Sequence, residues 1–506
     1  MFKNTLVVTS FLIFSAALGF LSQIIFASTF GASVEMDIYF KILSVPAILT
    51  GISPIIFSSV LIPAFAKFKS DKFGLNKFTD SMWIFIFVFG LFFILIGFVF
   101  STLNIDLFIP ENSADLKHIA VQVALLVWIG SGLMIMSSFL TAILNYKKQF
   151  FKVAWTSILP SFCMIIAVFL LHEFIGVRTI ALGFCIALLI QFLIFFNASK
   201  ISFNFSSFNV KHIQNKKQLL EQSLLVTLSL LPFTILAPIA YFWASQLEIG
   251  SISYIGYSQN FAGFLSVAVS MGISMVSFPE LADRFANQNG DSSLHNFEKS
   301  LKYVMLIAMF AAGLLIILRM PILSLFYQRG SFDASAVNNL SSILSWYLAA
   351  AVFTGGLNFL RTLFYSKGEF KKIAFFGLAI PLVFFVLSGI LKEKFSLVGI
   401  GIANLITLAI LFFISVYIAK NKELKFLTNS FYFFLLKNIL SILTTYFFVR
   451  IIMSFIGNNL SQLPTIIICI FLFLFAYLFS SRYLFRIKEI EDIIFLFMNK
   501  LKSFIK

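Results

Sequence analysis

Long apolar runs separated by short polar loops recur along the whole chain. A run of about 20 residues is long enough to cross the hydrocarbon core of a bilayer as an α-helix. The pattern predicts fourteen spans, at residues 5–28, 37–63, 80–103, 118–145, 152–172, 178–198, 219–246, 251–279, 300–326, 336–366, 372–391, 396–419, 430–456 and 463–485. Only the connections 199–218 and 280–299 are long. We therefore expect an all-α polytopic membrane protein without a separate soluble domain.

A stretch near residue 140 recurs near residue 360. Residues 140–155 (LTAILNYKKQFFKVAW) and 360–375 (LRTLFYSKGEFKKIAF) each contain an apolar helix end, a basic turn with a central phenylalanine, and the start of another apolar helix. They lie 220 positions apart, and a second match, between 62–67 (IPAFAK) and 278–283 (FPELAD), lies 216 apart. Two matches at nearly the same offset predict two pseudo-symmetric copies of a six-helix bundle. Because six is even, the copies have the same orientation and relate about an axis along the membrane normal.

The repeat also predicts the domain organisation. The first lobe covers residues 1–198, a basic cytoplasmic linker covers 199–218, and the second lobe covers 219–420. Spans thirteen and fourteen, within 421–485, have no counterpart in the first lobe and are an addition. Residues 486–506 mix apolar and charged side chains at roughly helical spacing, which predicts an amphipathic tail on the cytoplasmic membrane surface.

Composition and charge agree with a membrane protein. The chain is 60% hydrophobic and only 11% charged, with a net charge of +16. That charge is no sign of nucleic-acid binding, because the cations lie in short loops between apolar runs. Lysine and arginine number 21 in the loops on one side and 5 on the other. By the positive-inside rule both termini are cytoplasmic, and the expected location is the bacterial inner membrane.

Enzyme motifs are absent from the sequence. It contains no nucleophile elbow, phosphate-cradling glycine loop or Walker motif. The cysteines lie inside apolar runs and the histidines at span ends or in loops, without metal-ligand spacing; they are Cys163, Cys185, Cys469, His118, His172, His212 and His295. We therefore expect a transporter rather than an enzyme, with no cofactor and no bound metal.

Charged side chains within spans are candidate functional residues, because burying them in a membrane is costly. Asp37 and Lys41 are four residues apart and share one helix face, so they form either an ion or headgroup site or a structural pair. Arg361 either contacts phosphate oxygens or extends to the cytoplasmic interface. Lys437, deeper in span thirteen, either points into a headgroup groove or also extends to the interface.

Uncharged polar residues and prolines complete the candidate set. Ser22 and Gln23 in span one, and Gln259 and Asn260 in span eight, indicate either a hydrated central cavity or hydrogen bonding between helices. Prolines remove a backbone hydrogen bond and can bend a helix. The hinge candidates in spans two and seven are Pro46, Pro54, Pro232 and Pro238.

Several segments resemble one transporter family. They are 18–20 (LGF), 30–32 (FGA), 37–40 (DIYF), 267–272 (VAVSMG), 278–282 (FPELA), 325–332 (LFYQRGSF) and 364–366 (FYS). Together with fourteen spans in two lobes and two added helices, they resemble the MurJ/MviN family of lipid II flippases, within the multidrug/oligosaccharidyl-lipid/polysaccharide exporter superfamily. The resemblance covers about the first 420 residues.

The chain departs from the family's pattern at the arginines that are thought to hold the lipid-linked diphosphate. Ala16 replaces one arginine, Asn260 another, and Ser22 and Gln23 stand where the family has an Arg-Asp pair. A further arginine is missing near residues 50–51. The acid at Asp37 remains. Lys41, one turn from a position where the family often has a lysine, is a candidate replacement for part of the lost charge.

The resemblance implies a flippase that moves an undecaprenyl-linked saccharide, lipid II or a related glycan, from the inner to the outer leaflet during envelope biosynthesis. It also implies that spans thirteen and fourteen cradle the polyprenyl tail. The expected partners are this lipid and the membrane, the expected state is a monomer, and contacts with envelope-synthesis enzymes are possible. Three alternatives remain open: an O-antigen or exopolysaccharide flippase, a cation-coupled multidrug antiporter, and a non-transporting partner of envelope-synthesis enzymes.

Overall fold

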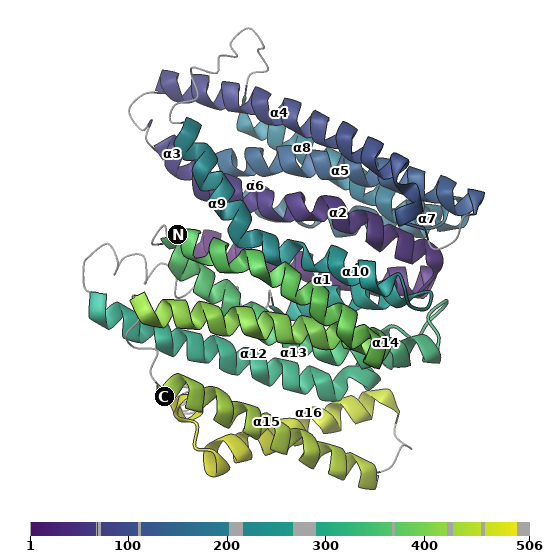
Figure 1. The fold of residues 1–506 in the computed structure, drawn as a ribbon, viewed down its shortest axis with the longest axis vertical. Coiled ribbons are helices and arrows are strands. Elements are labelled where there is room, and N and C mark those ends of the chain that lie inside the picture. The colour runs from purple at the N-terminus through teal and green to yellow at the C-terminus, as the bar shows by residue number, and fades with distance from the viewer. Residues whose placement is uncertain are drawn as a thin grey trace. The chain divides into compact units, whose positions relative to one another are not determined.

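The computed structural model describes residues 2–66, 68, 72–109, 113–201, 216–266, 290–366, 370–422, 429–456 and 461–492, and these residues are helical apart from short connections (Figure 1). Two compact units are present. Unit 1 contains Met1–Gly256, Gly330–Phe332 and Ile373–Gly389. Unit 2 contains Tyr257–Arg329, Asp333–Lys372 and Ile390–Lys506.

The helices of unit 1 include one π-helical and one 3-10 segment, η1 and η2. In chain order they are α1 (Phe2–Phe30), α2 (Val34–Ile56), η1 (Phe57–Leu61), α3 (Ile62–Ala66), α4 (Lys72–Leu103), η2 (Ile105–Leu107), α5 (Ala114–Tyr146), α6 (Phe150–Thr156), α7 (Leu159–Ile175), α8 (Arg178–Ser199), α9 (Lys216–Thr234) and α10 (Leu236–Ala244). A further helix, 251–266, begins in unit 1 and continues into unit 2.

Unit 2 contains the remaining helices. They are α12 (Gly290–Phe326), α13 (Ala334–Ser366), α15 (Asn429–Ile456), α16 (Gln462–Phe479) and the π-helical η5 (Ser480–Leu484). The long helix α14 (Phe370–Lys422) is divided between the two units.

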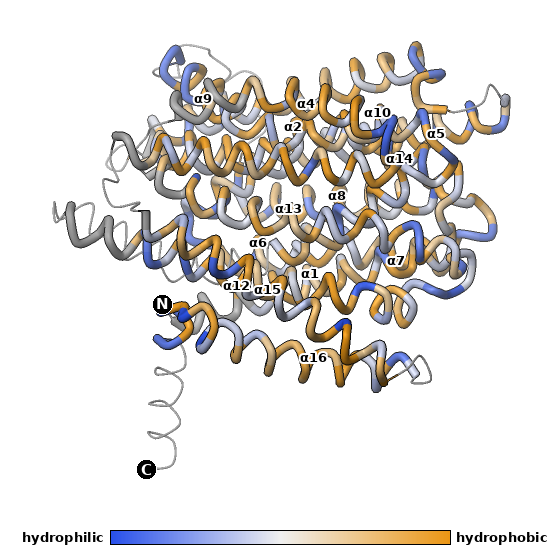
Figure 2. Tube along the Cα trace, turned by 60° about the horizontal axis from the view of Figure 1, so that its bottom comes forward, coloured by the Kyte–Doolittle hydropathy of each residue, from blue (hydrophilic) through white to orange (hydrophobic). Residues whose placement is uncertain are grey.

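The fourteen predicted spans are all represented by helices. Twelve described segments are long and apolar enough to cross a membrane, and apolar residues dominate their length (Figure 2). One of them, Leu378–Ala419, accounts for two predicted spans, since Ser396 within it has a non-helical backbone with φ 51°. The predicted span 251–279 is described only to residue 266. The fold class, an all-α protein with fourteen membrane helices, is confirmed.

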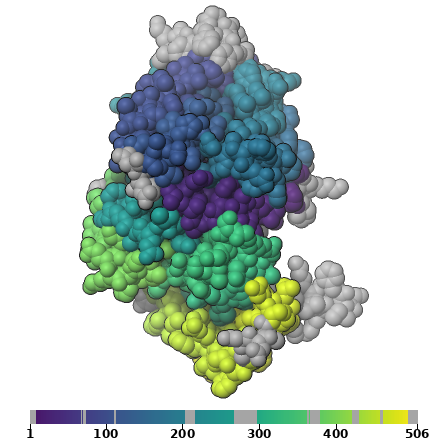
Figure 3. Space-filling view, turned by 90° about the vertical axis from the view of Figure 1, so that its right-hand side faces the viewer, coloured from purple at the N-terminus to yellow at the C-terminus, as the bar shows by residue number. Residues whose placement is uncertain are grey.

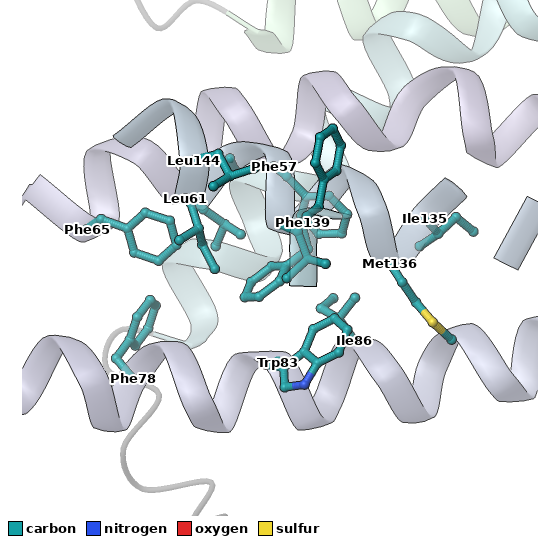
Figure 4. Close-up of a cluster of buried hydrophobic side chains, with 14 of the residues drawn as sticks. Phe57, Leu61, Phe65, Phe78, Trp83, Ile86, Ile135, Met136, Phe139 and Leu144 are labelled. Atoms are coloured by element: carbon teal, nitrogen blue, oxygen red, sulfur yellow. The ribbon is translucent and has the colours of Figure 1, made fainter. Parts of the chain in front are cut away.

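An aromatic cluster forms the core of unit 1. Helix α5 lies at its centre, with α2, α4 and α8 packed against it. Trp83 of α4 is fully buried and stacks on Phe139 of α5 at 6.0 Å between ring centroids (Figure 4). Lipid tails are as apolar as these side chains, so close packing rather than expulsion of water stabilises such contacts within a membrane. A hydrogen bond of 3.2 Å between Ser53 and Ser138 adds a polar link between α2 and α5.

In unit 2, buried polar side chains join α15 and α16 to each other and to α12. The Tyr477 hydroxyl donates to the Asn438 side-chain oxygen at 2.8 Å, and the Asn438 amide donates to the Met309 sulfur at 3.3 Å. The outer faces of α15 and α16 remain apolar and exposed, as at Phe455 and Phe471, and atoms of these helices form part of the surface in Figure 3. Such faces suit contact with lipid chains.

Several helix bounds differ from the prediction. Helix α12 starts at Gly290 rather than at 300. Near the predicted start it carries polar contacts that hydropathy does not register. Lys302 lies 3.1 Å from the buried carboxylate of Glu298 and 3.5 Å from Glu489. Glu489 belongs to the short helix 488–492, which is the described start of the predicted amphipathic tail; residues 493–506 lie outside the described part of the chain.

Candidate functional site

The carboxylate of Asp37 is held by the start of helix 251–266. Its Oδ2 accepts a hydrogen bond from the Gly250 N–H at 2.7 Å, and its Oδ1 accepts from the N–H of Ser253 at 2.7 Å and from the Ser253 hydroxyl at 2.5 Å. The first N–H groups of a helix have no acceptor within the helix and carry partial positive charge. Asp37 is only 8% exposed, so this contact satisfies a buried charge and the helix start together.

The residues in this contact are equivalent by the internal repeat. Asp37 and Ser253 are 216 positions apart, the same offset as the match between 62–67 and 278–283. Phe40 and Gly256 have the same separation, and a Cβ added to Gly256 would lie 2.8 Å from the Phe40 ring. The predicted pseudo-symmetry implies that a contact between equivalent residues lies near the axis that relates the two copies. We call Asp37, Phe40, Gly250, Ser253 and Gly256 the axial cluster.

Backbone contacts from a third segment lie beside the axial cluster in unit 1. The Ser331 N–H donates to the Ser28 carbonyl at 2.8 Å, and the Ser331 hydroxyl donates to the Thr29 carbonyl at 3.0 Å. Gly250 has φ +89°, and a Cβ there would lie 2.7 Å from the Ala32 carbonyl oxygen. The end of α1, the start of α2 and the segments around residues 250 and 331 therefore pack too closely for a substrate to pass between them.

The other predicted site residues in the first two spans belong to the same unit. Lys41 is half-buried, one turn along α2 from Asp37, and among the described contacts no Lys41–Asp37 ion pair within 4.0 Å occurs. Ser22 is buried and its hydroxyl donates to the Gly19 carbonyl of its own helix at 2.7 Å. Gln23 is half-buried.

The remaining predicted residues belong to unit 2. Gln259 is half-buried and Asn260 is exposed, further along the helix that Asp37 holds. Arg361 is half-buried near the end of α13. Lys437 is exposed on α15 next to Leu436, which is itself 53% exposed. The role of each of these four side chains stays a prediction.

Two of the predicted hinge prolines coincide with a helix break. Pro238 has no N–H to offer the Thr234 carbonyl, and the predicted seventh span is divided at Ile235 into α9 and α10. Pro232 lies in the last turn of α9. The other pair, Pro46 and Pro54, lies within α2, and the π-helical segment η1 begins three residues after Pro54.

Sequence reasoning missed the partners of Asp37. Gln259 and Asn260 of the same predicted span were candidates, but neither Ser253 nor Gly250 was assigned a role. The signal that could have found Ser253 is the 216-residue offset, applied to Asp37.

Comparisons with known proteins agree on one family. A family model described as "Lipid II flippase MurJ" matches residues 26–473. A "Probable lipid II flippase MurJ" of Borreliella burgdorferi is 24% identical over 453 residues, covering 88% of each chain. One of Helicobacter pylori is 25% identical over 320 residues, covering 56% of this chain and 66% of the relative.

Solved structures show the same fold. "Lipid II flippase MurJ, inward closed conformation" superposes with a TM-score of 0.78 at 21% identity, covering 95% of this chain and 99% of that one. An inward-facing multidrug resistance MATE family transporter of the MOP superfamily superposes with a TM-score of 0.60 at 15% identity, covering 79% of this chain and 94% of that one. Both are transporters built on the fold described above.

Proposed function

The chain belongs to the lipid II flippase MurJ family, and we propose that it moves a lipid-linked saccharide, either lipid II or a related undecaprenyl-diphosphate glycan, from the inner to the outer leaflet. It is a multi-pass membrane protein of a transporter family. The observation that carries the proposal is the axial cluster, in which Asp37 and Ser253, equivalent by the repeat offset, meet through a hydrogen bond of 2.7 Å.

The axial cluster would act as the outer closure of the substrate path. The distribution of lysine and arginine supports cytoplasmic termini, and with that orientation the end of α1 and Asp37 would lie on the outer side. Hydrogen bonds between two copies can break and re-form as the copies rock, so substrate could leave outward only after Asp37 releases residues 250 and 253. This is alternating access about the pseudo-symmetry axis.

The lobes of this mechanism would be residues 1–198 and 219–420, joined by 199–218. Helices α15 and α16, within 421–485, would hold the polyprenyl tail, since their exposed faces are apolar. Bending at the break between α9 and α10, and within α2, would let the lobes rock. Membrane potential or an ion gradient would drive the cycle, without a cofactor.

An anionic diphosphate needs a cation near its path. Within α2 the sequence offers Lys41, which is half-buried one turn from the axial cluster. We assign Lys41 the role of counter-charge for the substrate and Asp37 the role of closure. The proposed chemistry is the same for lipid II and for other saccharides on the same lipid carrier.

Complementation tests the proposal. The gene would be expressed in a strain depleted of its own lipid II flippase, with growth and accumulation of the lipid-linked precursor as readouts. Rescue by the wild type, and its loss in Lys41→Gln but not in Lys41→Arg, would support transport of an anionic lipid-linked substrate.

The same experiment separates the alternatives. Failure to rescue, together with rescue of an O-antigen flippase mutant, would replace lipid II by another glycan. Failure in both strains, with resistance to cationic drugs, would favour a multidrug antiporter. Failure in all three, in membranes where the protein is present and folded, would leave a non-transporting partner.

A further inference from the structure

A small polar pocket lies in unit 1, away from the axial cluster. Its volume is about 130 Å³, and its lining comes from α3, α4, the end of α5 and the end of α8. It includes Lys147, which belongs to the basic turn of the first repeat copy, and Lys200. The proposed transport cycle gives this turn no role.

The backbone around the pocket fixes the Lys147 side chain and the position of Lys200 in the chain. The Lys147 ammonium donates to the Ser199 carbonyl at 2.7 Å, at the end of α8. Lys200 follows in a left-handed conformation with φ 53°, which ends the helix and directs the chain away from it. Burial lowers the pKa of Lys147, and the charge of nearby Lys200 lowers that pKa further. Two cations that repel each other in one pocket favour an anionic ligand.

The other lining residues specify the size and chemistry of that ligand. Asn76 and Thr79 of α4 add polar atoms, while the buried Phe65 provides an apolar wall. Typical pockets for drug-sized ligands measure about 300–1,000 Å³. A phosphate group fits this space, whereas the glycan of a lipid-linked saccharide does not.

We propose that this pocket binds the phosphodiester group of an anionic phospholipid of the inner leaflet, between Lys147 and Lys200. The location follows from the proposed orientation, in which the basic turns face the anionic cytoplasmic leaflet. Free phosphate offers the same chemistry without acyl chains. Asp80 also lines the pocket. Its negative charge repels an anion and therefore lowers the affinity for the phosphodiester.

The chain provides a matched pair of variants. Lys200 and Lys148 are both exposed lysines with left-handed backbones, at φ 53° and 58°, but only Lys200 lines the pocket. Asparagine tolerates this conformation, so Lys200→Asn and Lys148→Asn remove one charge each without strain. Lys147→Gln is less informative alone, because it also removes the bond to Ser199.

The experiment measures phospholipid retention by the full-length protein. Protein extracted from membranes would be exchanged into detergent with defined phosphatidylglycerol or phosphatidylcholine, and bound lipids would be counted by native mass spectrometry. We expect Lys200→Asn to lower retention of phosphatidylglycerol about fivefold, the effect of one surface cation near an anionic leaflet. Lys148→Asn should leave retention unchanged, and Asp80→Asn should raise it.

Two outcomes would overturn the inference. Equal losses in Lys148→Asn and Lys200→Asn would show that phosphatidylglycerol responds only to net charge. The pocket would be assigned to free phosphate if inorganic phosphate stabilised lipid-free protein in a Lys200-dependent way while retention of phosphatidylglycerol did not depend on Lys200. Neither outcome bears on flippase complementation, so this inference and the proposed function can fail separately.

Discussion

Replacing Asp37 tests the axial cluster directly. In Asp37→Ala the N–H groups of Gly250 and Ser253 lose the carboxylate that accepts from them at the buried start of helix 251–266. In Asp37→Asn one side-chain oxygen remains, but the amide NH₂ would face a second N–H donor. The order of stability should therefore be wild type, then the asparagine variant, then the alanine variant.

The expected magnitude follows from the number of donors left unpaired. A buried donor without a partner costs about 1–3 kcal/mol, so two such donors cost about 2–6 kcal/mol before any rearrangement. Water entry and local opening lower that value, and loss of a helix-capping side chain alone costs about 0.5–2 kcal/mol. We expect Asp37→Ala to lower the free energy of opening at this helix start by about 2–4 kcal/mol, and Asp37→Asn to lower it by about half of that.

Hydrogen exchange at two backbone amides is the sharpest assay. The amides of Gly250 and Ser253 are protected by the Asp37 carboxylate, so their opening should increase in Asp37→Ala. Since about 1.4 kcal/mol corresponds to a tenfold change, 2–4 kcal/mol predicts exchange that is faster by roughly 30-fold to nearly 1,000-fold. The exchange of α5, which lies in the core of the same unit, should not change.

Asp333→Ala is the matched control. Asp333 accepts a hydrogen bond from the Ala336 N–H at 2.8 Å, so it also caps a helix start, but it is exposed and caps only the helix that follows it. Its loss should affect exchange at 335–337 and leave residues 250 and 253 unchanged. Unchanged exchange at those two amides in Asp37→Ala would refute the assignment of Asp37 as a closure.

Two further predictions concern stability, measured as thermal unfolding in detergent. Lys302→Met should lower the free energy of unfolding by about 3–5 kcal/mol, because it leaves the buried Glu298 without its cation. Lys299→Met, whose ion pair is half exposed, should lower it by less than about 1 kcal/mol. Equal losses in the two variants would contradict the burial argument. Gly250→Ala should be strongly destabilising at φ +89°, while Gly263→Ala, with open space around it in a helix, should be neutral or stabilising by about 0.5–1 kcal/mol.

Hydropathy predicted the helices well because each span must satisfy its own backbone hydrogen bonds in lipid. The run at 336–366 became α13 with nearly the same bounds. Features that depend on side-chain packing were not visible in this pattern. The π-helical turns at 57–61 and 480–484 change the backbone register without changing hydropathy.

The candidate site shows a different limit. Spacing along one helix identified Lys41 as a neighbour of Asp37, since residues four apart share a face. The hydrogen-bond partners of Asp37 come instead from residues more than 200 positions away, at the start of another helix. A local pattern holds no information on such a contact. The internal repeat does, since it relates Asp37 to Ser253 by its offset.

The roles of Asp37 and Lys41 can be separated by asking which groups neutralise each charge. The Asp37 carboxylate is satisfied by amide and hydroxyl donors, so it does not need the Lys41 ammonium as a partner. The hydroxyls of Ser22 and Thr50, at or beside positions where the family has arginines, donate to carbonyls of their own helices. Neither hydroxyl supplies charge. In the proposed mechanism, the positive charge that an anionic lipid requires within α2 would therefore rest on Lys41, and the charge of Asp37 would serve the closure.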